Sequence, residues 1–338
     1  MKKKRAIFLA LIAALLLGDT VLEFVVDQVA QRLNRVSHPG PYEIDEKVAT
    51  LHRSLFIADL HTDALLWNRD LLERSPHGHL DLPRLREGNV ALQVFSAVTQ
   101  IPWGINVHSN PADSDLLLPL VLLQRWPLAT WTSPMQRALY QARKLEELVQ
   151  RADDLILVRS RSDLTTLLER RQHGEQKGGL TPFGRRIVRR AQDLGMVIDL
   201  AHTAPQTIEE IAALTTAPLL VSHTGVQATC DSPRTLSDAH LRAIAGSGGL
   251  VGIALFPAAI CAEDLDHAVE AMLHAVRTIG AAHVALGTDF DGAVTTPIDA
   301  AGLAQLTGKL LAAGLSKKEI ESIMGANVLH FLDAILPK

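Results

Sequence analysis

Short apolar runs alternate with longer amphipathic segments along the C-terminal half of the chain. The runs at 196–201, 218–222, 249–255 and 283–289 have the length of strands and carry few polar residues. Segments with helical spacing separate and follow these runs, at 205–214, 236–248, 264–280, 300–314 and 316–332. Strands that are apolar on both faces are typical of a parallel sheet with helices on both sides. The pattern therefore predicts an α/β fold.

The N-terminal half adds two more strand-like runs, at 55–63 and 90–97, joined by a loop that contains His77 and His79. No composition shift divides the chain after residue 50. A length of 338 residues allows either two ordinary domains or one large α/β barrel. Because no boundary is apparent, we expect a single domain that spans residues 50–338.

The pattern is weaker between 97 and 179. We expect a helix over 126–152 and a short strand over 154–160. Beyond Gly178 and Gly179, Thr181 and Pro182 are typical of a helix start.

The first eighteen residues resemble an export signal, since the basic sequence "MKKKR" precedes the apolar run "AIFLALIAALLLG". The run is not followed by a site with small residues where a signal peptidase would cut. We therefore expect residues 1–35 to be an uncleaved signal-anchor and stalk, with the domain exported to the periplasmic or extracellular side. The alternative is a buried amphipathic helix of the fold.

Composition narrows the possible partners. A net charge of −4 and 4% aromatic residues give no footprint for nucleic acid. Cys230 and Cys261 lack the spacing of a thiolate metal site, and one disulfide between them is open if the domain is exported.

Metal-ligand side chains follow the predicted strands. His61 and Asp63 end one strand, while His202, His223 and Asp289 each end another. In barrels and open α/β folds the carboxyl ends of strands form the site. Imidazole and carboxylate groups suit zinc, and two such ions could activate a water for attack on an amide carbonyl. Alternate residues of a strand share a face, so His61 and Asp63 can contact one ion.

Each residue also has a structural reading. A single histidine at a strand end is more often a hydrogen-bonded structural residue, and Asp289 and Asp291 in "GTDFDG" suit a turn. Arg234 in "CDSPRTLSD" suits a surface position beside the helix cap Ser237. The shared placement at strand ends favours the metal site.

With these motifs the chain resembles the renal dipeptidase family, also called membrane dipeptidases, which are zinc enzymes with a (β/α)8 barrel. The resemblance covers most of residues 50–338. It rests on "ADLHTDALLW", "NVALQVFSA", "KGGLTPFG", "VIDLAHTAP", "VSHTGVQATCDSPRTLSD" and "HVALGTDFDG".

The resemblance implies a role for each candidate residue. One zinc would be held by His61 and Asp63, and a second by His202 and His223. Asp289 would be the general acid/base. Arg234 would bind the free carboxylate of a dipeptide, which suits its planar and permanently charged group.

One part of the family pattern is missing. In the family a glutamate on the third strand bridges both ions and a histidine after the fourth strand contacts substrate. Here "HGEQKGGLTPFG" directly follows "RSRSDLTTLLERRQ", so we predict a TIM-type barrel shortened by about two strands, the third and fourth, near residue 172. Glu175 is the nearest carboxylate, but it follows no strand. The resemblance implies two bound zinc ions. If the bridging glutamate is missing, the alternative is that the chain binds one zinc ion or none.

The sequence therefore predicts an exported, membrane-anchored metallodipeptidase, with impairment through the missing glutamate as an open issue. Its partners would be a dipeptide, the membrane through the N-terminal segment, and a second copy of the chain as a candidate dimer partner. The alternative is a catalytically inactive dipeptidase-like binding protein. An amidohydrolase barrel fits less well, because such sites usually begin with His-x-His.

Overall fold

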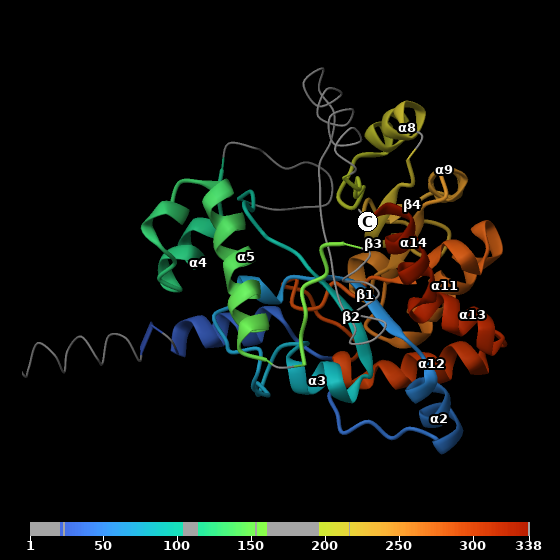
Figure 1. The fold of residues 1–338 in the computed structure, drawn as a ribbon, viewed down its shortest axis with the longest axis horizontal. Helices are drawn as coiled ribbons and strands as arrows, with labels where there is room; N and C mark the ends of the chain where they lie inside the picture. Colours follow the sequence, from blue (N-terminus) through green and yellow to red (C-terminus); the bar gives the residue numbers. More distant parts are fainter. Residues whose placement is uncertain are drawn as a thin grey trace, which may run out of the picture.

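A parallel sheet forms the centre of the molecule (Figure 1). The computed structural model describes residues 21–22, 24–103, 114–152, 154–160, 196–215 and 217–336. Within them the sheet has six strands in the order β2-β1-β6-β5-β3-β4, and neighbouring strands are parallel. The strands are β1 (Ile57–Thr62), β2 (Val90–Phe95), β3 (Leu220–Val226), β4 (Thr235–Leu236), β5 (Leu250–Ile253) and β6 (Val284–Leu286).

The strand order is that of a barrel with a gap. β1 pairs with β2, β3 pairs with β4 and β5, and β5 pairs with β6. The last strand, β6, pairs back to β1, as the last strand of a barrel does. The predicted strand at 196–201 is reduced to one bridge, from Asp199 to Leu220 beside β3. No strand of the described residues lies between β2 and Asp199. In a complete barrel the third and fourth strands would lie at that position, and residues 104–113 and 161–195 lie outside the described residues.

The predicted strand at 154–160 is wrong. These residues form no ladder, although Ile156 and Val158 pack against Leu92 and Val94 of β2. The apolar character of the segment thus reflects burial against the sheet. Burial alone does not make a strand when backbone pairing is missing.

Helices surround the sheet, and those predicted over 205–214, 236–248, 264–280 and 300–314 are confirmed. Side chains of Ser237, Asp264 and Ser316 cap three of the helices by accepting backbone N–H groups. The helices are α2 (Glu46–Ser54), α3 (Leu82–Glu87), α4 (Leu117–Leu123), α5 (Pro134–Gln150), α8 (Pro205–Leu214), α9 (Asp238–Gly246), α10 (Pro257–Ile260), α11 (Leu265–Ile279), α12 (Leu303–Ala312), α13 (Lys317–Glu321) and α14 (Asn327–Ile335). Short 3-10 turns lie at Ala64–Leu66, Leu128–Thr130, Ala281–His283 and Ala300–Gly302.

Two predicted helices differ in extent. The helix expected over 126–152 begins only at Pro134, where Ser133 caps it. The helix expected over 316–332 is interrupted between α13 and α14. A β-carbon on Gly325 would lie 2.0 Å from the carbonyl oxygen of Phe56. The chain therefore needs a glycine, and a break in the helix, to pass the start of β1.

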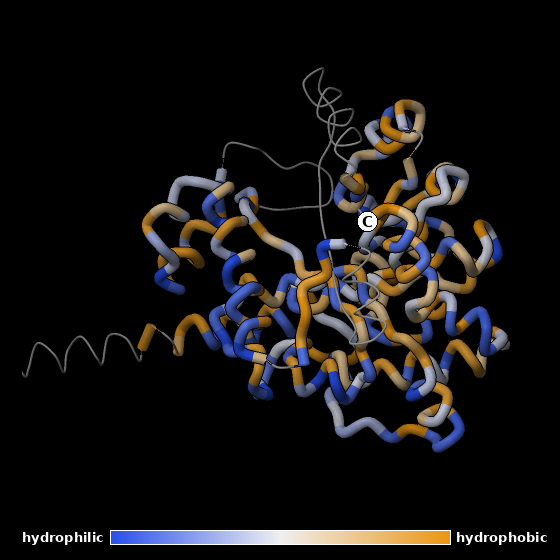
Figure 2. Tube along the Cα trace, in the orientation of Figure 1, coloured by the Kyte–Doolittle hydropathy of each residue, from blue (hydrophilic) through white to orange (hydrophobic). Residues whose placement is uncertain are grey.

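The apolar strands and the inner faces of the helices form the core (Figure 2). A smaller cluster joins the helix at 24–33 to α4 and the loops around it, through Ala30, Trp67, Leu117 and Trp126. In Figure 1 this helix, α4 and α5 form a lobe beside the sheet. None of the described helices has the length and apolarity to cross a membrane. Residues 1–20 of the predicted signal-anchor and stalk, which spans 1–35, lie outside the described residues, and the domain limits stay predictions.

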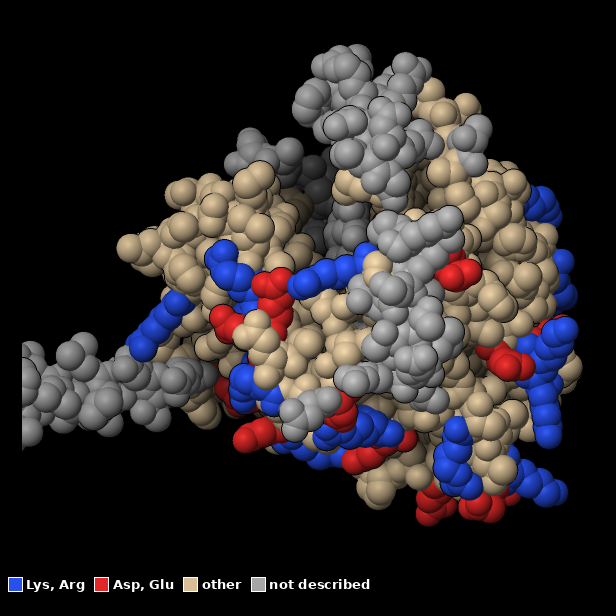
Figure 3. Space-filling model, in the orientation of Figure 1, with Lys and Arg blue, Asp and Glu red and all other residues tan. Residues whose placement is uncertain are grey.

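Charges of both signs are interspersed on the face shown in Figure 3. Several exposed charged side chains form ion pairs. Arg53 pairs with Glu46 and Arg86 with Asp154, each with a nitrogen–oxygen distance of 2.7 Å. Such exposed pairs add little stability. The buried charged groups of the site are therefore of more interest than these surface pairs.

Candidate active site

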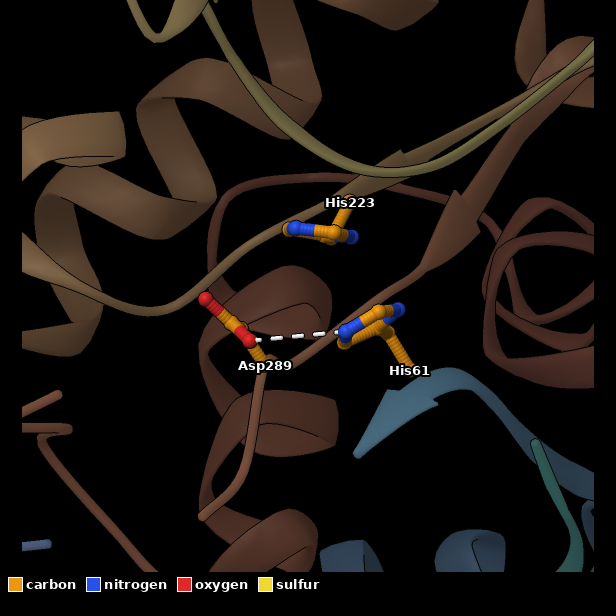
Figure 4. Close-up of side chains that lie close together, drawn as sticks. All are labelled: His61, His223 and Asp289. Atoms are coloured by element: carbon orange, nitrogen blue, oxygen red, sulfur yellow. Dashed lines mark ion pairs between the residues drawn. The ribbon is translucent and has the colours of Figure 1, made fainter. Parts of the chain in front are cut away.

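Three buried side chains converge at the carboxyl ends of the strands (Figure 4). His61 ends β1, His223 lies in β3, and Asp289 follows β6. One ligand atom from each lies within 4.8 Å of the others, and His61 Nε2 is 3.7 Å from Asp289 Oδ1. The rings of His61 and His223 lie 3.8 Å apart between centroids. Imidazole and carboxylate groups placed this closely could hold a divalent metal ion such as zinc.

The two other predicted ligands border this cluster. Asp63 Oδ1 lies 3.6 Å from His61 Nε2, and it is buried without a hydrogen-bond partner in the part of the chain that the structure describes. His202 is exposed, and its Nε2 lies 2.8 Å from His223 Nε2. A buried carboxylate oxygen without a donor is costly, and a cation beside it would offset that cost. The residues therefore fit a metal site.

Arg234 lies beside the cluster, on the loop before β4. Its Cζ is 5.5 Å from the centre of the Phe256 ring, and its buried Nη2 has no hydrogen-bond partner among the described residues. Burial lowers the pKa of Arg234, while the nearby carboxylates of Asp289 and Asp199 act in the opposite direction. The guanidinium can therefore bind an anionic group of a ligand.

A disulfide holds the Arg234 loop. Cys230 and Cys261, whose Cα atoms are 5.4 Å apart, join this loop to the end of α10. The sequence had left this disulfide open. It ties the arginine's loop to the segment that carries Phe256.

Residues 165–336 match the membrane dipeptidase family (peptidase family M19). The chain belongs to the membrane dipeptidase family. It is 36% identical over 160 residues to a dipeptidase of Schizosaccharomyces pombe, a match that covers 45% of this chain and 39% of the relative. The chain thus spans about two fifths of that relative's length.

Solved structures of the membrane dipeptidase family share the fold. The metallopeptidase dipeptidase AC aligns with a TM-score of 0.71 and 21% identity, over 84% of this chain and 100% of that one. A metallopeptidase from Rhodobacter sphaeroides, solved with a phosphinate mimic of L-Ala-D-Ala, aligns with a TM-score of 0.69 and 20% identity, over 83% and 99% of the two chains. At this identity the likeness supports the fold alone.

The second aspartate of "GTDFDG" has a structural role in this family member. Asp291 accepts a 2.9 Å hydrogen bond from the His79 backbone N–H and forms an ion pair with Arg69. Burial alone would raise the pKa of Asp291, but Arg69 and His79 hold it below its usual value. Asp291 therefore connects the loop that contains His79 to the turn that follows Asp289.

Sequence reasoning missed three polar residues beneath the ligands. Ser222 Oγ lies 3.0 Å from His223 Nδ1 and 3.4 Å from His61 Nδ1. Asp59 is buried within β1, and Asp199 is buried in the segment that bridges to β3. The one available signal was periodicity, since Asp59 shares a strand face with His61. Glu175 and "KGGLTPFG" lie outside the described residues.

Proposed function

We propose that this chain is a metal-dependent dipeptidase. The observation that carries the proposal is the convergence of His61, His223 and Asp289 from three separate strands, beside an Asp63 oxygen that has no hydrogen-bond donor among the described residues. Membership of the membrane dipeptidase family supports the same reaction class. The substrate would be a dipeptide with a free carboxylate.

In this proposal His61 and Asp63 hold one zinc ion, and His202 and His223 hold a second. Bound zinc would polarise the substrate carbonyl and lower the pKa of a water molecule. Asp289 lies against His61, where its carboxylate can take the proton from water and pass it to the leaving amine.

The missing bridging glutamate makes the number of ions the point to test. Two carboxylates, Asp63 and Asp289, lie within reach of His61. We expect two equivalents of zinc by elemental analysis of the purified protein, and hydrolysis of a dipeptide panel with zinc added. Two zinc ions without hydrolysis would indicate an impaired enzyme. No zinc and no hydrolysis would favour the inactive binding protein.

Replacing Arg234 by methionine is expected to raise KM for dipeptides by about 100-fold, with a smaller change in kcat. The buried guanidinium would bind the substrate carboxylate, and a charge-assisted bidentate contact contributes about 1.5–3 kcal/mol. Arg234→Lys keeps the charge without the planar geometry, so its KM should lie between the two. Arg242→Met is the control, because Arg242 is exposed and forms an ion pair with Asp238. Equal KM values for Arg234→Met and the unmodified enzyme would contradict this role.

We also propose export, with the N-terminal segment in the membrane. The basic residues 2–5 and the apolar run 6–18 support it. The disulfide supports it as well, since disulfides persist mainly in oxidising compartments. In fractionated cells the full chain should resist carbonate extraction from membranes, and recovery in the soluble fraction would contradict the anchor.

A further inference from the structure

Two buried aspartates hold equivalent positions beneath the metal ligands. Asp59 Oδ1 accepts a 2.7 Å hydrogen bond from the backbone N–H of Thr288, the residue directly before Asp289. Asp199 Oδ1 accepts a 2.9 Å hydrogen bond from the backbone N–H of Ser222, the residue directly before His223. In both cases a carboxylate on one strand segment binds the residue next to a candidate ligand on the neighbouring segment.

Each aspartate also binds its own segment two residues ahead. The His61 N–H lies 3.5 Å from Asp59 Oδ1, and the Ala201 N–H donates to Asp199 Oδ1 at 3.0 Å. Ala201 directly precedes His202. One oxygen atom of each aspartate therefore connects two ligand-bearing segments, β1 with the turn after β6 in one case, and the His202 segment with β3 in the other.

Asp59 differs from Asp199 in the use of its second oxygen. Asp59 Oδ2 accepts from Thr288 Oγ1 at 2.7 Å and from Gln93 Nε2 at 2.8 Å. Gln93 lies on β2, so Asp59 also connects a third strand. Both aspartates are almost fully buried, at 0% and 2% exposure. Buried carboxylates are tolerated when several donors compensate for lost water. Here the donors are backbone N–H groups in or next to the ligand-bearing positions and, for Asp59, two side chains as well.

We propose that Asp59 and Asp199 are positioning residues that set the spacing of the candidate metal ligands. Asp59 fixes His61 relative to Asp289, and Asp199 fixes His202 relative to His223. This inference rests on the proposed metal-binding function. Residues that orient metal ligands from outside the ligand shell typically change metal affinity by about 10–100-fold when they are removed.

The proposal makes different predictions for the two asparagine variants. The asparagine carbonyl oxygen can accept both N–H groups that Asp199 Oδ1 accepts, so Asp199→Asn should bind zinc within about 3-fold of the unmodified chain. Asp59→Asn would place an NH₂ group against the donors Thr288 Oγ1 and Gln93 Nε2, so its zinc affinity should fall about 10-fold or more. Both alanine variants should lose about 10–100-fold.

The first experiment measures zinc affinity of these four variants by competition with a chromophoric chelator. Asp299→Asn is the matched control, because Asp299 is also a buried carboxylate but pairs with Arg84, apart from the ligands. Equal zinc affinity in both alanine variants and the unmodified chain would overturn the proposal. An equal loss in Asp299→Asn would also overturn it, since the effect would then be general destabilisation.

The second experiment needs no metal. Amide hydrogen exchange of the metal-free full chain, resolved to single residues, should accelerate at Thr288 but not Ser222 in Asp59→Ala, and at Ser222 but not Thr288 in Asp199→Ala. Equal acceleration at both amides in either variant would contradict positioning. If the unmodified chain binds no zinc, the metal-dependent function fails, while this exchange pattern still decides whether the two aspartates position the strands.

Discussion

Replacing His223 by alanine is expected to abolish zinc binding and dipeptide hydrolysis together. His223 is the centre of the cluster, because its ring lies 3.8 Å from that of His61 and its Nε2 lies 2.8 Å from that of His202. Removing residues outside the ligand shell already weakens metal binding by about 10–100-fold, so removing a ligand should cost more than about 100-fold. The measurement is zinc content after dialysis, with hydrolysis of a dipeptide at saturating substrate.

Two variants separate this effect from general damage. His267→Ala removes an exposed histidine of α11 that pairs with Asp264, and it should leave zinc content and hydrolysis unchanged. His223→Gln keeps a polar side chain for Ser222 but loses the imidazole ligand, so it should behave like His223→Ala. Full zinc content in both His223 variants would remove His223 from the site.

The sequence was sufficient for the strands that carry the ligands. Their apolar runs are short and nearly unbroken, and the ligands directly follow them, so periodicity placed His61, His223 and Asp289 at one end of a parallel sheet. The sequence also predicted the helices over 205–214, 236–248, 264–280 and 300–314, because the residues that begin a helix are close to it in sequence. Ser237 and Asp264, for example, cap helices through bonds within three residues.

The features that the sequence did not reveal depend on contacts between distant segments. The bond from Thr288 to Asp59 spans 229 residues, and nothing local to Asp59 distinguishes a positioning carboxylate from a turn former. The break before α14 arises because Gly325 meets the Phe56 carbonyl, which no pattern near Gly325 indicates. The segment at 154–160 is apolar enough for a strand, but whether it pairs depends on its neighbours in space.

Replacing Asp289 by asparagine should largely abolish turnover, as the His223 variants do, but unlike them it should retain the metal. Asp289 has a φ of 61°, a left-handed conformation that asparagine adopts readily and alanine does not. Asparagine therefore preserves the turn while removing the proton acceptor. A positioned acid/base group contributes about 100- to 10,000-fold, so kcat should fall by that factor at saturating zinc.

The metal content of Asp289→Asn determines what Asp289 does. The carboxylate lies 3.7 Å from His61 Nε2, close enough for either a zinc ligand or a neighbouring acid/base. Zinc affinity within about 3-fold of the unmodified chain, together with the loss in kcat, supports the acid/base role. A ligand role predicts that zinc is lost as well, because an asparagine oxygen is a far weaker ligand than a carboxylate. Asp266→Asn, at an exposed carboxylate that pairs with Lys309, is the control for the charge change. Unchanged kcat in Asp289→Asn would contradict both roles, and the reaction would then need another proton acceptor.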